Sequence, residues 1–349
     1  MKNKIKTLLI VTLVLLFSCE NKNETTALKQ IANLPKDLKE ISGIAFYNNL
    51  IYTLEDSGNP NNIVVIDTLG NTKKTISVTN IENIDWEDLT FDNKGNLYIG
   101  DFGNNDNVRK DLAIHKINQT ELQNDEVETA YKITFDYPEQ KEFPPKKKEL
   151  LFDVEGFFEY HNHFYLFTKN RSKGFDGTSY IYKIPNKAGH HHAQLIKTIT
   201  TCSDYHNCAI TSATISPDGS KFGLLSHSKI WLFENYTNDD ITTGKMTELD
   251  LKHYSQKEAI CFKNNNDLFL ADEKVKKTGG NLFKVNALLL PMTHLAATGF
   301  LLLCFIALLL SIATIIFEFL YFLAILFSSK KNKTNPLQRS TLAMFTSLD

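Results

Sequence analysis

The chain has 349 residues, of which 42% are hydrophobic, and a formal net charge of −2 at pH 7. A chain of this length can bury a large core without a structural metal or disulfide. The near-neutral charge, with no basic stripe or stacking motif, argues against nucleic acid as a partner.

The first residues are typical of a bacterial export signal. Lysines among the first six residues precede an apolar run, which is the order of charged and apolar regions in a signal peptide. The run ends at Cys19 in the motif Leu-Phe-Ser-Cys, which resembles a lipobox. We expect residues 1–19 to be a lipoprotein signal peptide, Cys19 to carry the lipid and residues 20–26 to be a tether. The mature protein would then lie outside the cytoplasm in the bacterial cell envelope, anchored to a membrane.

One pattern then recurs along the chain: a β-rich segment, a turn, and further β-rich segments. The five repeats begin at Ser42, Glu87, Glu155, Ser212 and Glu258. Turns rich in Asn, Asp and Gly follow each first segment, as tight antiparallel hairpins require. The first four repeats also have a fourth strand-like segment, at residues 75–78, 131–135, 195–199 and 246–251. Four strands per unit, with units spaced roughly 45 to 70 residues apart, are typical of β-propeller blades.

The fifth repeat ends after its third strand, near residue 285. The strand-like segment 27–34 precedes the first repeat and has no partner there. We expect it to supply the missing strand of the last blade, because a closed ring hides its sheet edges. The sequence therefore predicts an all-β, five-bladed β-propeller over residues 27–286, with six blades as the alternative.

The residues that open the repeats are expected to meet at one mouth of the central channel. Glu87, Glu155 and Glu258 occupy the same place in three blades, and carboxylates brought together raise each other's pKa values unless a cation compensates them. One interpretation is a calcium site with these three glutamates as ligands, because calcium prefers oxygen ligands. The other is a polar plug in which Lys169 or Arg171 neutralises them.

Further candidate ligand-binding residues lie where strands meet the same mouth. They are Ser42, Asp56, Trp86, Asp101, Asn170, Arg171, His227 and Asp272. The indole of Trp86 could stack on a sugar or another flat ligand, and His227 or Asp101 could act as a catalytic base. Asp56 and Asp101 each open an Asp-x-Gly-Asn motif, for which turn formation is the alternative role.

The cysteines and clustered histidines suggest local roles. Cys202 and Cys208 flank five residues, and we expect a disulfide between them in an oxidising compartment, in preference to a metal site. The run His190-His191-His192 lies between outer strands on the rim, where we expect adventitious metal at most.

The C-terminal region changes composition abruptly. Residues 295–327 are almost all apolar and lysines follow them, which exceeds the roughly 20 residues of a membrane helix and places the basic flank in the cytoplasm. Two interpretations stay open for residues 287–349: an inner-membrane anchor with a basic cytoplasmic tail, or a fused or frame-shifted sequence appended to a complete propeller. A lipoprotein destined for the outer membrane should lack such a helix, because the helix would arrest it in the inner membrane.

Four short segments carry a family resemblance. They are Asp85-Trp86-Glu87-Asp88-Leu89, Gly100-Asp101-Phe102-Gly103-Asn104-Asn105, Val154-Glu155-Gly156-Phe157 and Gln256-Lys257-Glu258-Ala259-Ile260. Together they resemble uncharacterised β-propeller lipoproteins of the Bacteroidetes type. More distantly, the Glu-Gly start of a blade is similar to phytase-type esterase and gluconolactonase or paraoxonase propellers, in which a central cation activates an ester or lactone.

Two functions follow as expectations. The first is an anchored propeller that binds a small molecule, glycan or protein through the channel mouth and loop face. The second is a calcium-dependent hydrolase of ester, lactone, phosphoester or glycosidic bonds, as the distant resemblance implies. The chain contains no nucleophile elbow, phosphate loop or zinc motif, which favours the binding function.

Overall fold

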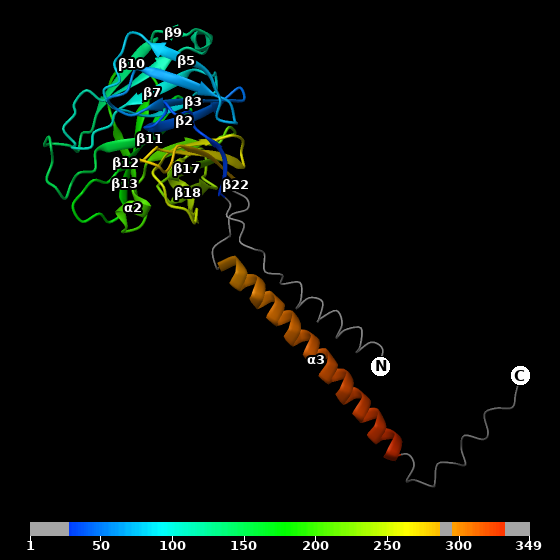
Figure 1. Ribbon diagram of the computed structural model, residues 1–349. Coiled ribbons are helices and arrows are strands. Elements are labelled where there is room, and N and C mark those ends of the chain that lie inside the picture. The colour runs from blue at the N-terminus through cyan, green and yellow to red at the C-terminus, as the bar shows by residue number, and fades with distance from the viewer. Residues whose placement is uncertain (1–27, 287–294, 332–349) are drawn as a thin grey trace, which may run out of the picture. The chain divides into compact units, whose positions relative to one another are not determined.

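A computed structural model describes residues 28–286 and 295–331 of the chain (Figure 1). The chain divides into two compact units with the boundary after Leu290. The first unit contains five β-sheets and the second contains a helix, and each is described by itself.

Each sheet of the first unit is one blade with four antiparallel strands at its centre. Blade 1 consists of β2 (Ile41–Tyr47), β3 (Leu50–Glu55), β4 (Asn62–Ile66) and β5 (Thr72–Val78). Blade 2 consists of β6 (Trp86–Phe91), β7 (Leu97–Asp101), β8 (Ala113–Ile117) and β10 (Tyr131–Asp136). Blade 3 consists of β11 (Asp153–Tyr160), β12 (His163–Lys169), β13 (Thr178–Pro185) and β15 (Gln194–Thr200). Blade 4 consists of β16 (Ser212–Ile215), β17 (Lys221–Leu225), β18 (Lys229–Glu234) and β19 (Lys245–Asp250).

The last blade is completed by the N-terminal strand. Blade 5 consists of β20 (Lys257–Phe262), β21 (Asp267–Asp272), β22 (Asn281–Asn286) and β1 (Leu28–Asn33). Strand β1 runs antiparallel to β22, with Leu28 opposite Val285. The closure predicted from the incomplete fifth repeat is therefore confirmed.

The inner strands form a closed ring. Strands β2, β6, β11, β16 and β20 contact one another in this order, and β20 contacts β2 again. The propeller therefore has five blades, and the six-bladed alternative is wrong. The hydrophobic core lies between neighbouring blades, because the two faces of each blade are covered by the blade before it and the blade after it in the ring. Its five clusters include Trp86 with Tyr52, Phe157 with Tyr98, Phe158 with Phe222, Phe262 with Leu232, and Ile44 with Phe269.

Two short parallel strands extend blades beyond the predicted pattern. β9 (Glu126–Val127) pairs with β5, and β14 (Gly189–His192) pairs with β10. The connections also contain the 3-10 helices η1 (Gln119–Gln123) and η2 (Ile241–Thr243) and the short helix α2 (Tyr205–Cys208). The side chain of Asp204 caps α2, and Cys202 and Cys208 form a disulfide with a 1.92 Å sulfur–sulfur bond.

The second unit contains α3 (Leu295–Lys331), a helix of 37 residues. Its segment Leu309–Leu326 is long and apolar enough to cross a membrane, as predicted from composition. The predicted signal peptide, Cys19 and the whole tether lie outside the described residues, as do residues 332–349 of the tail.

Candidate functional site

A β-bulge recurs at the same place in four inner strands. The pairing register shifts around one extra residue in blades 1, 2, 3 and 5. The extra residues are Ser42, Glu87, Glu155 and Glu258. A bulge re-aims the side chain of its extra residue, which turns these groups towards the mouth of the channel instead of the core between blades. Ser212 differs, because β16 pairs without a bulge and Ser212 lies in register with Leu225.

One side of the mouth, which we call the paired sector, contains Asp153, Glu155, Lys169, Arg171, His227 and Glu258. Lys169 Nζ lies 3.0 Å from Glu155 Oε2 and 4.0 Å from Glu258 Oε2. Arg171 donates from Nε to Asp153 Oδ2 at 2.6 Å and from Nη2 to Glu155 Oε1 at 2.5 Å. His227 Nε2 lies 2.8 Å from Glu258 Oε1. The carboxylates of this sector therefore already have basic partners.

The electrostatics of the paired sector reflect this compensation. Burial by itself would raise the pKa of Glu258, but Lys169 and His227 bring it below its ordinary value. Burial by itself would lower the pKa of Lys169, but Glu155 and Glu258 raise it above its ordinary value. Opposite charges at this distance favour the charged form of both partners. Compensation is incomplete at Glu155, because burial outweighs Lys169 and Arg171 and raises its pKa to about 8. Glu155 and Glu258 nevertheless both have basic partners, as the plug interpretation expects.

Next to the paired sector lies a group that we call the acidic sector, which contains Asp56, Asp85 and Glu87. One carboxylate oxygen from each lies within 4.8 Å of the other two. An oxygen of Glu87 also lies within 4.8 Å of oxygens of Asp153 and Glu155 in the paired sector. Among the residues that the structure describes, none of the three acidic-sector residues forms an ion pair with a lysine or arginine. Glu87 accepts a hydrogen bond from Ser42 Oγ at 3.2 Å and is only 4% exposed, whereas Asp56 and Asp85 are half-buried.

Burial and repulsion between carboxylates favour the neutral forms of Asp85 and Glu87. Burial, followed by the charge of Asp56, raises the pKa of Asp85 to about 7. Burial, followed by the charge of Glu155, raises the pKa of Glu87 well above its ordinary range. Three carboxylates this close cannot all be charged at neutral pH without a cation nearby.

Because Gly103 has no side chain, there is room beside it for the carboxylates of Asp85 and Glu87. A Cβ atom on Gly103 would lie 2.2 Å from Glu87 Oε1 and 2.5 Å from Asp85 Oδ2. The loop after β7 can therefore approach both carboxylates only because this residue has no side chain. Ligand binding and turn formation were the two roles expected for the motif that includes Gly103, and the space that it leaves for the carboxylates was not foreseen.

Asp88 is a buried acid that the sequence analysis missed. It follows the bulge of β6 and accepts hydrogen bonds from Leu89 N at 2.8 Å, Ser212 Oγ at 3.2 Å and Phe157 N at 3.3 Å. It thereby links the inner strands of blades 2, 3 and 4, and burial raises its pKa well above the ordinary range. The signal in the sequence was that the equivalent positions hold only glycine or alanine in the other bulged strands, at Gly43, Gly156 and Ala259.

Two residues expected at the mouth are enclosed instead. Trp86 has no exposed surface and packs in the core between blades 1 and 2, so its expected stacking on a ligand is wrong. It immediately precedes the bulge, which leaves its side chain on the core face. Asp272 is also fully buried and accepts a hydrogen bond from Asn281 N at 2.7 Å. Its carboxylate supports the loop before β22 and does not face a ligand.

Asn170 also has a local structural role. Its side chain is buried, donates to Asp176 Oδ1 at 3.1 Å and accepts from Ser172 N at 2.8 Å. These contacts hold the loop that follows β12. The expectation that Asn170 faces a ligand is therefore wrong, because both ends of its amide are engaged within its own loop.

The two candidate bases are held by other side chains. Asp101 is buried, and its Oδ1 accepts from Arg109 Nη2 at 2.9 Å and from the backbone N–H of Asp85 at 3.2 Å. His227 contacts Glu258 through Nε2, and its Nδ1 lies 3.4 Å from the hydroxyl of Tyr254. Asp101 thus positions the loop of the acidic sector.

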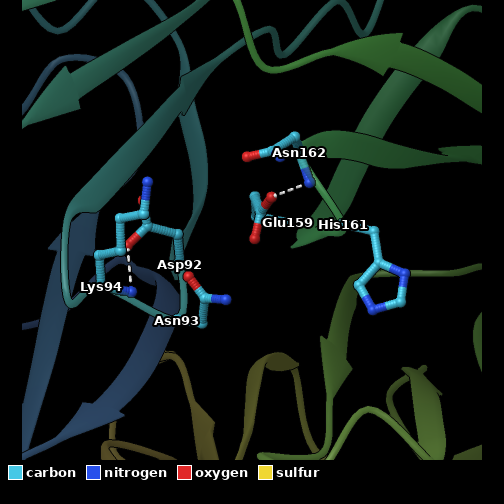
Figure 2. Close-up of a pocket in the computed structure, with 6 residues that line it drawn as sticks. All are labelled: Asp92, Asn93, Lys94, Glu159, His161 and Asn162. Atoms are coloured by element: carbon cyan, nitrogen blue, oxygen red, sulfur yellow. Dashed lines mark hydrogen bonds between the residues drawn. The ribbon is translucent and has the colours of Figure 1, made fainter.

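The opposite face of the propeller, where the inner hairpins turn, contains two polar pockets. Figure 2 shows the first, of about 230 Å³, which is lined by Asp92, Asn93, Lys94, Glu159, His161 and Asn162. Glu159 accepts a hydrogen bond from the backbone N–H of Asn162 at 2.7 Å, and burial raises its pKa to about 7. The second pocket, of about 360 Å³, lies beside Tyr160 and Tyr236. Neither pocket was expected from the sequence.

Comparisons with known proteins concern the fold. No protein-family model and no curated protein matches the chain. One similar solved structure is a chain of a nidogen/laminin complex, at 12% identity and a TM-score of 0.41, covering 68% of this chain and 74% of that one. Another is the PQQ-bound aldose sugar dehydrogenase of Streptomyces coelicolor, at 9% identity and a TM-score of 0.45, covering 74% and 97%. Both are β-propeller proteins, and at this distance the likeness is one of fold alone.

Proposed function

We propose that the chain is a membrane-anchored β-propeller lipoprotein of the bacterial envelope that binds a ligand at the mouth of its channel, and that Asp56, Asp85 and Glu87 hold a calcium ion there. The observation that carries the proposal is the acidic sector, in which three carboxylate oxygens lie within 4.8 Å of one another. Calcium binds six to eight oxygen ligands and favours anionic ones. Burial is the main cause of the raised pKa values of Asp85 and Glu87, and a bound cation would relieve the repulsion between carboxylates that adds to it.

The exposure of Asp56 and Asp85 would allow a bound cation to coordinate a further ligand from outside the protein. Both are half-buried and reach the surface, so a cation held by them would keep coordination positions open to solvent. Hydroxyl, carboxylate or phosphate oxygens of a small molecule, glycan or protein could fill these positions. The lipid on Cys19 and the apolar helix α3 would hold the propeller at the membrane.

This proposal changes the cation ligands expected from the sequence. Glu87 is retained, but Glu155 and Glu258 are ion-paired with Lys169, Arg171 and His227. A cation bound by Glu155 and Glu258 would have to displace buried basic groups and leave them without partners, which is costly.

Calcium binding by the full-length chain in detergent tests the proposal. We expect one calcium ion per chain by isothermal titration calorimetry, and at least about 10-fold weaker binding after Glu87→Gln or Asp85→Asn, because each removes an anionic ligand. Asp111→Asn is the matched control, since Asp111 is 59% exposed and pairs with Arg109 outside the acidic sector. Absence of calcium binding in the wild type, or equal losses in Asp111→Asn and Glu87→Gln, would refute the site.

The second candidate function is a calcium-dependent hydrolase, which the solvent-facing side of the acidic sector favours. Chromogenic ester, lactone, phosphoester and glycoside substrates test it directly. Hydrolysis that disappears with chelator and with Glu87→Gln, but persists in Asp111→Asn, would establish it. If calcium binds and none of the four substrate classes is hydrolysed, the binding function stands alone.

A further inference from the structure

Strand β14 brings two histidines to one side of the junction between blades 2 and 3. It pairs in parallel with β10, and His192 lies opposite Asp136 in the register. Because alternate residues of a strand point to the same face, His190, His192 and Asp136 share the outer face of this pair. Phe135, which precedes Asp136 on β10, points to the other face of the sheet and is buried in the core.

The side chains on the outer face contact one another. His192 Nδ1 lies 2.6 Å from Asp136 Oδ1, and His190 Nε2 lies 3.8 Å from the same oxygen. The Thr134 hydroxyl lies 3.1 Å from His190 Nδ1. This contact on Nδ1 orients the imidazole so that Nε2 is directed at Asp136, which is how hydrogen bonds position metal-ligating histidines.

We infer that Asp136, His190 and His192 form a binding site for a divalent transition-metal ion of the zinc class that joins blade 2 to blade 3. One ligand atom from each residue lies within 4.8 Å of the others. Small rotations of exposed side chains would bring two nitrogens and an oxygen to the roughly 2 Å zinc–ligand distance, with the fourth tetrahedral position left for water. The sequence suggested only adventitious metal, because Asp136 lies 56 residues before His192 and was not recognised as a third ligand.

A metal ion at this site would connect two neighbouring blades. Asp136 ends the outermost regular strand of blade 2, whereas β14 belongs to the connection between β13 and β15 of blade 3. An ion held by both segments would reinforce the four residue pairs of the β10–β14 contact. The side chains of Asp136, His190 and His192 are 47%, 54% and 74% exposed, so an ion can enter without opening the fold. Because the site exists only in the folded state, a bound ion would stabilise the folded protein by mass action.

Zinc titration of the full-length chain in detergent tests the inference. The protein is purified through a tag without histidines, stripped with chelator and titrated with Zn²⁺ in the presence of excess calcium. The variants are His190→Ala, His192→Ala and Asp136→Asn. The matched control is His191→Ala, because His191 lies on the other side of the strand, with Nε2 at 2.7 Å from the carbonyl oxygen of Lys187. Glu87→Gln shows whether the acidic sector contributes to zinc uptake.

We expect one zinc ion per chain, with affinity at least about 10-fold lower in each of the three variants and unchanged in His191→Ala and Glu87→Gln. Zinc should also raise the melting temperature of the wild type and of His191→Ala, but not of the three variants. Thr134→Val should weaken zinc binding less than loss of a ligand does, since it removes only the contact that orients His190. Equal losses in His191→Ala and His192→Ala would show an unstructured histidine chelate, and unchanged zinc uptake in all three variants would equally overturn the inference.

Discussion

Gly156→Ala tests how closely the inner strands approach beneath the mouth. Gly156 follows the bulge of β11, and a Cβ atom there would lie 2.3 Å from the backbone nitrogen of Ala213 and 2.5 Å from the backbone carbon of Ser212. Both atoms belong to β16 of the next blade and cannot rotate away as a side chain would. The ring must therefore widen by about 1 Å to restore ordinary contact. Overpacking typically lowers the free energy of unfolding by 1–3 kcal/mol. We expect a loss of about 3 kcal/mol for Gly156→Ala, because both clashes are with backbone atoms.

Gly223→Ala is the matched control. Gly223 also lies in an inner region of the propeller, on β17, but the nearest atoms to a Cβ there are 3.7 Å away. An alanine fits without displacement and reduces the entropy of the unfolded chain, so we expect a change between zero and about 1 kcal/mol of stabilisation. The two substitutions have the same chemistry and differ only in the space available.

Urea unfolding followed by tryptophan fluorescence measures both variants. The chain contains two tryptophans, and Trp86 and Trp231 are both fully buried in different inter-blade clusters. With a slope near 3 kcal/mol per molar urea, a loss of about 3 kcal/mol lowers the midpoint by about 1 M. A Gly156→Ala midpoint equal to that of the wild type would refute the close approach of β11 and β16.

Three further predictions concern the closure, the hairpin face and the anchor. Deleting residues 28–34 should expose the edge of β22 and cause unfolding or aggregation, whereas a circular-dichroism melt like that of the intact chain would show that β1 is dispensable. Burial raises the pKa of Glu159 from its ordinary value to about 7, so the ionisation of Glu159 destabilises the folded state as the pH rises through this range. The free energy of unfolding of Glu159→Gln should equal that of the wild type at pH 4 and exceed it by about 1 kcal/mol at pH 8, after allowing for solvent screening. Cys19→Ala should abolish metabolic labelling with palmitate, and an unlabelled wild type would contradict the lipobox interpretation.

The fold was predictable because each blade is built from local signals. The hairpin turns and the apolar strands recur in the same order, and the incomplete fifth repeat pointed to β1 as its partner. The convergence of Glu87, Glu155 and Glu258 followed from that repeat, because equivalent positions in a ring must face one axis. Their binding of calcium stays a prediction, and our proposal keeps only Glu87 of the three as a ligand because Glu155 and Glu258 are ion-paired.

The errors came from features that depend on one residue of register or on distant segments. Trp86 and Glu87 are adjacent, but the bulge between them decides that the indole enters the core and the carboxylate faces the mouth; a shift of one residue exchanges the two faces of a strand. The β14 strand pairs with a segment more than 50 residues earlier, and no local pattern indicates this. Whether Lys169 reaches Glu155 depends on the conformation of a long side chain, which sequence does not determine.

The acidic sector makes a final prediction that separates a calcium site from a polar plug. Burial and Asp56 raise the pKa of Asp85 to about 7, so the folded state without calcium holds a proton that the unfolded chain releases near pH 4. In chelator, stability should therefore fall as the pH rises from about 4 to about 7. Calcium requires the ionised carboxylates and competes with that proton. The rise in melting temperature on adding calcium should be small at pH 5 and large at pH 8, and the rise at pH 8 should be much smaller in Glu87→Gln, which binds calcium more weakly. A calcium effect of the same size at pH 5 and pH 8 would mean that the ion binds elsewhere, and the three carboxylates would then be a protonated plug.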